Sequence, residues 1–332
     1  AVITSVDDDG SGMTREIIEG PLLTLFSSSK EDDSSKIGKY GIGFVSVFAM
    51  DPVHVDVHTR RGDAEQWRVR LFGDHSFELS RMPRDTNGTT VSIVQQKEEG
   101  NFDVHVERAQ VALTKWCRHA RVPITLMILD AANLTASRSV TINEPFGLGG
   151  AVIATHAADN ETFFVAVGRD SERSETSASS ALHAGYYNRG LTLFESNDAE
   201  KGLGGVRFKV DSPRLSHTLS RDNVKRDREH DRVLGVVKEL VRERLWREVL
   251  VRTSDAAEKV AAAPRDEGAI RDCRLLLEAT FATAFEKKKN EGVRVPLIEP
   301  LDGKRTLLLN DLEPGPSGAE IVMLEPGRDG VE

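Results

Sequence analysis

The chain of 332 residues is long enough for two domains, and its 39% hydrophobic and 29% charged content is typical of an ordinary globular protein. Its 44 basic and 53 acidic residues give a net charge of −9, which disfavours non-specific binding to nucleic acid. Two cysteines, Cys117 and Cys273, are too few for a disulfide framework, so we expect a reducing, cytoplasmic location. No stretch has the length and apolarity of a membrane span.

The first expected strand covers residues 2–7 and ends in a group of carboxylates. Asp8 is our candidate for a ligand-binding carboxylate, because strand alternation sends Asp7 and Asp9 to the opposite face. The residues Gly10, Gly12 and Met13 follow. Glycine lets the backbone turn sharply and approach a flat ligand closely. The alternative interpretation is an aspartate that only ends a strand before a tight turn.

A helix with Thr14 as its N-cap and residues 16–25 as its body is expected next. The polar, serine-rich residues 27–36 are either a solvated loop or a lid over a ligand. A second glycine cluster precedes the apolar run 44–50, and its glycines are Gly38, Gly41 and Gly43. Their backbone N–H groups and the helix start behind them suit phosphate groups. Together, the two clusters predict a nucleotide pocket. The spacing of their glycines matches neither a P-loop nor a Rossmann fingerprint.

The middle of the chain predicts a sheet and then a helix. Residues 53–93 alternate between apolar and polar side chains, which indicates an antiparallel sheet with one buried face and a turn at Asn87-Gly88. The following residues 104–119 have helical spacing, and we expect Trp116 and Cys117 to lie in the core. A return strand at 124–129 should end the first domain.

A second domain is expected from about residue 151, after a glycine-rich boundary. Its predicted strands are residues 151–154, 163–167 and 188–194, with a polar loop at 169–180, and its predicted amphipathic helix is 233–249. Beyond residue 256 we expect a helix at 275–285 and one or two strands within 296–309. The nine histidines show no ligand or triad spacing and are interpreted as surface or ordinary core residues.

Several segments resemble the ninety-kilodalton heat-shock chaperones, which belong to the GHKL group of ATP-binding proteins. The run from Ile37 to Phe48 is similar to their IGxFGxGFxSxF signature, and the segment from Gly88 to Ile93 resembles the strand that closes their adenine pocket. Residues 204–211 and then 219–224 resemble the middle-domain segment in which a valine-aspartate strand leads to an LSRE turn and a long helix. The resemblance covers roughly residues 1–250.

The resemblance implies an α+β fold. A GHKL (Bergerat) α/β sandwich ATPase domain, N-terminally incomplete, would occupy residues 1–143. A second α/β domain resembling the chaperone middle domain would occupy 151–253, and a divergent extension of helices and strands would occupy 254–332.

The resemblance also implies ATP and Mg²⁺ as ligands. The residues implied in nucleotide binding are Asp8, Gly10, Gly12, Met13, Gly38, Lys39, Tyr40, Gly41, Ile42, Gly43, Phe44 and Thr89. Adenine offers a donor amino group beside a ring acceptor, which suits the Asp8 carboxylate with Thr89 as a relay hydroxyl. Lys36 and Lys39 either add charge at the phosphates or are solvated.

Arg221, at the LSR position, is implied as the catalytic arginine that reaches the γ-phosphate, unless it pairs with Asp222 or Asp227 at a helix start. Lys225 stands where the family often has a glutamine, which puts part of that contact in doubt. The family's catalytic glutamate and metal-binding asparagine lie on a helix before the first strand, so we assign neither role, and no metal ligand, to any residue of this chain.

The resulting functional prediction is a chaperone-type ATPase in which lid and domain closure act on a client or partner protein. A homodimer formed through other regions is possible in such a protein, and neither nucleic acid nor a membrane is expected as a partner. The alternative is a nucleotide-sensing scaffold that binds ATP without turnover. A DNA-topology or mismatch-repair ATPase is disfavoured by the acidic composition.

Overall fold

The computed structural model describes residues 1–23, 44–74, 76–96, 102–130, 135–167, 183–203, 205–218, 223–263, 265–284, 296–298 and 307–308. The chain forms two compact units, Ala1–Ala112 and Leu113–Glu332, and each is described by itself. Both combine a largely antiparallel sheet with separate helices, as expected for an α+β protein.

The first unit is built on a five-stranded antiparallel sheet in the order β1-β5-β2-β3-β4. The strands are β1 (Val2–Asp8), β2 (His54–Arg61), β3 (Glu65–Leu71), β4 (Phe77–Arg81) and β5 (Gly88–Gln95). Alternation in β2 and β3 buries every second side chain, including Val55, Val57 and Val69, and leaves the others partly exposed. This confirms the predicted antiparallel sheet with one buried face.

Two helical segments, one before residue 24 and one after residue 43 in the sequence, cover the buried face of the sheet. Thr14 caps α1 (Arg15–Ile17) as predicted, since its Oγ1 accepts from the Ile17 N–H at 3.4 Å. The helix continues as a π-helical turn, η1 (Ile18–Leu22), in which Pro21 lacks the N–H that a regular α-helix would use. Ile18 is fully buried in the sheet's core, and η2 (Val45–Met50) packs Phe48 against the same cluster.

The expectation that Trp116 and Cys117 are core residues is wrong. Both lie at the end of α2 (Phe102–Cys117), and both are only half-buried. None of the residues of α2 is fully buried, and the ammonium of Lys115 lies 4.9 Å from the centre of the Trp116 ring. An amphipathic spacing therefore identified the helix correctly but overstated how far its apolar side is covered.

The strand predicted at 124–129 is present as β6 (Thr125–Leu129), paired in a two-stranded antiparallel sheet with β7 (Ala136–Thr141). The polar sequence of β7 carries no strand pattern. The division between the compact units falls within α2, whereas the predicted first domain ends at residue 143. The difference is the segment 113–143, in which Arg118 and Arg121 bond to residues of the second sheet. The domain ranges remain predictions.

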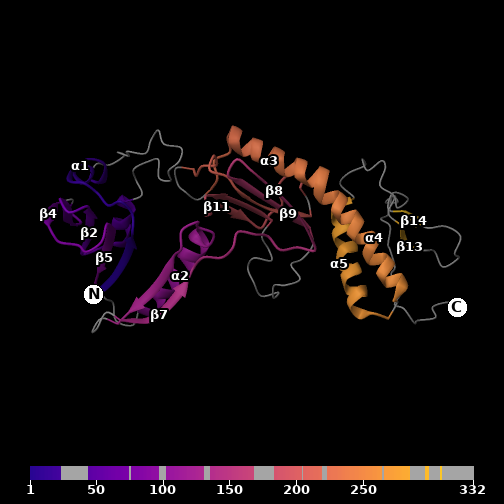
Figure 1. Cartoon of the computed structure of the whole chain (residues 1–332), viewed down its shortest axis with the longest axis horizontal. Helices are drawn as coiled ribbons and strands as arrows, with labels where there is room; N and C mark the ends of the chain where they lie inside the picture. The colour runs from indigo at the N-terminus through magenta and orange to yellow at the C-terminus, as the bar shows by residue number, and fades with distance from the viewer. Residues whose placement is uncertain are drawn as a thin grey trace. The chain divides into compact units, whose positions relative to one another are not determined.

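The second unit is built on a five-stranded mixed sheet in the order β11-β10-β12-β9-β8. The strands are β8 (Val152–Ala158), β9 (Glu161–Val167), β10 (Ala184–Asn188), β11 (Leu191–Ser196) and β12 (Val206–Asp211), and only β10 and β12 are parallel. The first part of a long helical run covers one face of this sheet, and the run then continues beyond the sheet (Figure 1). It comprises α3 (Arg228–Leu240), η4 (Val241–Leu245) and α4 (Trp246–Ala262), which include the predicted helix 233–249.

The strand predicted at 188–194 is corrected to a hairpin. Asn188 ends β10 and β11 begins at Leu191, because Arg189 and Gly190 both have positive φ, at 52° and 78°. Such a pair forms the two-residue turn whose twist suits antiparallel strands. The remaining elements are α5 (Glu267–Ala284), β13 (Pro296–Ile298) and β14 (Leu307–Leu308), at the helix and strands expected there.

Candidate functional site

Three polar residues form a row across the first sheet. Asp8 at the end of β1 lies opposite Thr89 of β5, and Thr89 lies opposite Thr59 of β2. Because side chains alternate between faces, the row lies on the same face as the buried Val57. Thr59 is fully buried, Thr89 is half-buried and Asp8 is exposed, so the row leads from the core to the surface.

Thr59 is the centre of the hydrogen bonding in this row. Its hydroxyl accepts from the Met13 N–H at 2.9 Å and donates to the Gly88 carbonyl at 3.2 Å. Its oxygen lies 3.1 Å from the Thr89 hydroxyl oxygen. Thr59 was not among the predicted site residues, although a hydroxyl at a buried position of the Val55/Val57 alternation was a usable signal.

Two glycines allow the close approach of the backbones around the row. Gly12 has φ +67°, and a Cβ there would lie 1.9 Å from the Arg60 carbonyl oxygen. Gly88 has φ +124°, and a Cβ there would lie 2.0 Å from the Asp8 carbonyl oxygen. Both positions therefore require glycine. Their contacts are with neighbouring backbone, so the predicted role of Gly12 beside a ligand remains a prediction.

The carboxylates of Asp7 and Asp8 lie on opposite faces of the sheet and make different hydrogen bonds. Asp7 lies on the other face, where Thr90 and the Arg84 Nη2 (3.0 Å) donate to its Oδ1. These bonds, led by that from Thr90, hold the pKa of Asp7 below its usual value. Asp8 accepts from the Gly10 N–H at 2.9 Å through Oδ1, in a local turn of the loop itself. Its second oxygen can accept from a ligand.

Apolar side chains adjoin the acceptors of the row. Val6 lies two residues before Asp8, hence on the same face, and 66% of its surface is exposed. Met13, Phe44 and Val91 are half-buried and pack against the sheet's core cluster. This face therefore offers the exposed apolar side chain of Val6 near a carboxylate and a hydroxyl, an arrangement that suits an apolar ring with polar edges.

Glu65 holds the segment that follows Met13. Its Oε2 accepts from the Arg15 N–H at 3.0 Å and from the Trp67 indole N–H at 2.5 Å. The bond from Trp67, followed by that from Arg15, lowers the pKa of Glu65. The guanidinium of Arg81 lies 4.7 Å from the centre of the Trp67 ring. The start of α1 is therefore tied to β3.

Much of the predicted phosphate-binding wall lies outside the described residues. This is true of Gly38, Lys39, Tyr40, Gly41, Ile42 and Gly43, of the lid candidate 27–36 with Lys36, and of Arg221. Phe44, which begins the described part after this gap, is half-buried at the start of η2. Lys225 is described, and its Nζ lies 3.6 Å from the Asp227 carboxylate at an exposed position.

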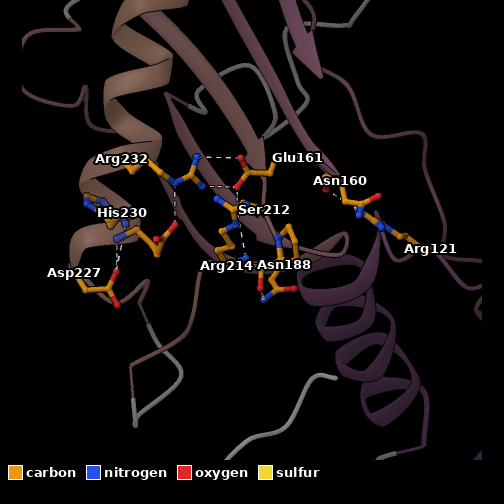
Figure 2. A network of polar contacts seen from close by, with 11 residues as sticks. Arg121, Asn160, Glu161, Asn188, Ser212, Arg214, Asp227, His230 and Arg232 are labelled. Atoms are coloured by element: carbon orange, nitrogen blue, oxygen red, sulfur yellow. Dashed lines mark hydrogen bonds and ion pairs between the residues drawn. The ribbon is translucent and has the colours of Figure 1, made fainter. Parts of the chain in front are cut away.

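The second unit contains a polar network at one end of α3 (Figure 2). Arg232 of α3 donates to both oxygens of Glu161, at 3.0 and 2.5 Å, and Ser212 donates to the same carboxylate at 2.5 Å. Burial raises the pKa of Glu161, but the bonds from Arg232 and Ser212 outweigh it and lower the pKa. Asp227 caps α3 by accepting from the Glu229 and His230 N–H groups. The network therefore fixes the start of the long helix against the sheet.

Two further features of the described residues bear on the chemistry. Among them, no group of three or more histidine, cysteine, aspartate or glutamate side chains is placed to hold a metal ion. Within the same part of the chain, no helix is both long and apolar enough to cross a membrane.

Comparisons with known proteins identify chaperone relatives. No family model matches the chain. It is similar to the chaperone protein HtpG of Gluconobacter oxydans, with 31% identity over 135 residues, or 37% of this chain and 21% of the relative. It is also similar to HtpG of Methylobacterium nodulans (33% over 136 residues, 37% and 22%) and of Aliivibrio fischeri (29% over 142 residues, 38% and 22%). The matches thus span about a fifth of these relatives' length, and they support a relationship to the ninety-kilodalton heat-shock chaperones.

Proposed function

We propose that the first unit binds adenine nucleotides at the row formed by Asp8, Thr89 and Thr59, as part of a chaperone of the HtpG type. The observation that carries this proposal is the pairing of Asp8 with Thr89 on adjacent strands, beside exposed apolar surface. The similarity to HtpG supports it at the level of the family.

The chemistry of the row fits the base. The amino group of adenine donates hydrogen bonds, and a carboxylate is the strongest acceptor that a side chain offers. Val6 and Met13 supply apolar surface for the faces of the ring. Asp8 would therefore select the amino edge, while the surrounding apolar surface would contribute to affinity without selecting a base.

The phosphates would lie against the second glycine cluster. Backbone N–H groups at Gly38, Gly41 and Gly43, with Lys39 nearby, would neutralise phosphate charge. Mg²⁺ would accompany ATP by binding its phosphate oxygens, as the resemblance implies. We assign Asp8 to the base and assign no protein ligand to the metal.

We further propose that the complete protein hydrolyses ATP. Arg221 would stabilise the transferring phosphoryl group, and nucleotide-dependent closure would act on a client or partner protein in the cytoplasm. Homodimer formation through other regions fits a protein of this family. A chain that binds nucleotide but does not hydrolyse ATP would instead be a nucleotide-sensing scaffold.

Calorimetric titration of ADP into the chain tests the binding proposal. We expect Asp8→Asn to weaken ADP binding more than tenfold, because a charge-assisted hydrogen bond contributes about 1.5–3 kcal/mol. Asp9→Asn is the matched control, since it removes the same charge from the neighbouring exposed position and should retain the affinity. Absence of ADP binding by the unmodified chain, or equal affinities of the two variants, would contradict the assignment.

A further inference from the structure

We propose that His119 is a pH switch in the second unit. Its protonation releases a segment that we call the arm, residues 118–124 and 142–148, from one face of the second sheet, while α3 stays packed on the other face. The proposal is independent of nucleotide binding by the first unit. It follows from the contacts of the arm and from the charges around His119.

The two parts of the arm are joined by hydrogen bonds and should move together. The Glu144 N–H donates to the Arg118 carbonyl at 2.6 Å. The side-chain amide nitrogen of Asn143 donates to the carbonyls of Ala120 and Val122, both at 2.8 Å. The arm is therefore one bonded structure and not two separate loops.

The arm lies on the face of the second sheet that is opposite α3. Tyr186 of β10 belongs to the core cluster that α3 shares with the sheet, and alternation directs its neighbour Tyr187 to the other face. There the rings of His119 and Phe146 meet the Tyr187 ring edge-on, with centroids 5.4 and 5.1 Å away. Phe146 also meets Phe164 of β9 edge-on at 5.6 Å. The arm therefore covers the aromatic part of this face.

His119 can hold the arm in this position only as a neutral imidazole. Its Nε2 lies 3.0 Å from the Nζ of Lys209 in β12, and both side chains are buried. A lysine ammonium only donates, so Nε2 is the acceptor. A proton on Nε2 would remove this acceptor and would place two cations 3.0 Å apart in the interior, where water screens their repulsion poorly. Lys209 is held in the sheet, so the arm is the part that moves away.

The other ionisable groups beside His119 do not relieve this repulsion. The Glu195 carboxylate of β11 accepts from the Arg118 guanidinium and from the Tyr187 hydroxyl, so Arg118 balances its charge. Burial, followed by the charge of Glu195, raises the pKa of Tyr187, so its hydroxyl stays neutral. The Glu144 side chain is exposed, and this residue meets His119 through its backbone carbonyl.

The size of the effect follows from the two pKa values of His119. Burial, followed by the charge of Lys209, lowers this pKa to about 4 in the docked arm, whereas release should return it to near 6.5. The released form therefore binds the proton more tightly, and acid favours it. Between about pH 7.5 and about pH 5, the equilibrium constant for release should rise about 25-fold.

Hydrogen exchange at about pH 7.5 and about pH 5, corrected for the intrinsic exchange rate at each pH, tests the switch. The opening constant of the arm amide groups should rise about 25-fold. At about pH 5 these groups should be at least about tenfold less protected than those of α3 and less sensitive to low urea concentrations, because a local opening exposes little surface. Equal protection and equal urea dependence of the arm and α3 would mean global unfolding and would overturn the proposal.

His119→Gln isolates the titrating group. The glutamine amide can accept from Lys209 and donate to the Glu144 carbonyl, but it cannot take up a proton. The rise in arm opening should therefore shrink to less than about threefold. His156→Gln is the matched control, because this half-buried histidine of β8 contacts Phe163 instead of the arm, and it should retain the full rise. An undiminished rise in His119→Gln would overturn the proposal.

A second test applies should His119→Gln fail to fold. Nuclear magnetic resonance titration of the His119 ring should give a pKa of about 4 in the unmodified chain. Lys209→Met removes the neighbouring charge, so it should bring this pKa closer to 6.5 and reduce the rise in arm opening. A His119 that titrates near 6.5 in the unmodified chain while the arm stays protected would overturn the proposal.

Discussion

His119 is a buried residue whose protonation should oppose folding. It is 6% exposed, and its Nε2 lies 3.0 Å from the Nζ of Lys209, which is 3% exposed. A lysine ammonium only donates, so Nε2 is the acceptor and Nδ1 carries the proton that bonds to the Glu144 carbonyl at 3.2 Å. Burial, followed by the charge of Lys209, lowers the pKa of His119 to about 4.

The second unit should therefore lose stability as the pH decreases from 6.5 to about 4. The unfolded chain binds the His119 proton near the ordinary histidine pKa of 6.5, whereas the folded chain binds it only near about 4. The stabilisation is complete above pH 6.5 and is lost as the pH falls towards 4, by about 3 kcal/mol in total. Urea denaturation at about pH 7.5 and about pH 5 should show about 2 kcal/mol of this loss, because pH 5 is still above the folded-state pKa, and His119→Gln should reduce it. The same loss in the variant would rule out His119 as the cause.

At the scale of elements, Gly88 of β5 allows the backbone at the end of β1 to approach closely. The φ of +124° and the 2.0 Å approach to the Asp8 carbonyl leave no room for a side chain at this position. We expect Gly88→Ala to lower the free energy of unfolding by about 2 kcal/mol or more, because it combines backbone strain with a steric clash. Gly73→Ala is the matched control, since a Cβ there would meet nothing within 4 Å.

Urea denaturation of the two variants gives the comparison. Gly73→Ala should be neutral or slightly stabilising, because alanine restricts the unfolded chain. If Gly88→Ala were as stable as Gly73→Ala, the approach of β5 to β1 that places Thr89 beside Asp8 would be wrong.

Periodicity in the sequence predicted the elements that are regular and half-buried. The alternation around Val55 and Val57 identified the first sheet, and the spacing of Val233 to Val249 identified the long helix. The hairpin at Arg189-Gly190 was missed because apolar residues flank the turn on both sides and mask it. The polar strand β7 carried no alternation to detect.

The candidate site was predicted only in part for a similar reason. Asp8 and Thr89 could be named from their motifs, and the register of β1 with β5 then places them opposite each other. Thr59 could not be named, because its role depends on pairing between strands that lie far apart in the chain. Such cross-strand contacts follow from topology rather than from local spacing.

At the scale of the molecule, the two compact units have separate cores and different polar networks. The acidic composition, with a net charge of −9, disfavours non-specific binding to nucleic acid. The similarity to HtpG covers 37–38% of the chain in the relatives named above.

A crystal structure of the chain with bound ADP tests the central claim most directly. We expect the amino nitrogen of adenine to lie within hydrogen-bond distance of the Asp8 carboxylate, about 2.7–3.2 Å, with Thr89 on the same edge of the base. The ring should cover Val6 and Met13. ADP bound at another surface, or an adenine whose amino group does not contact Asp8, would contradict the account.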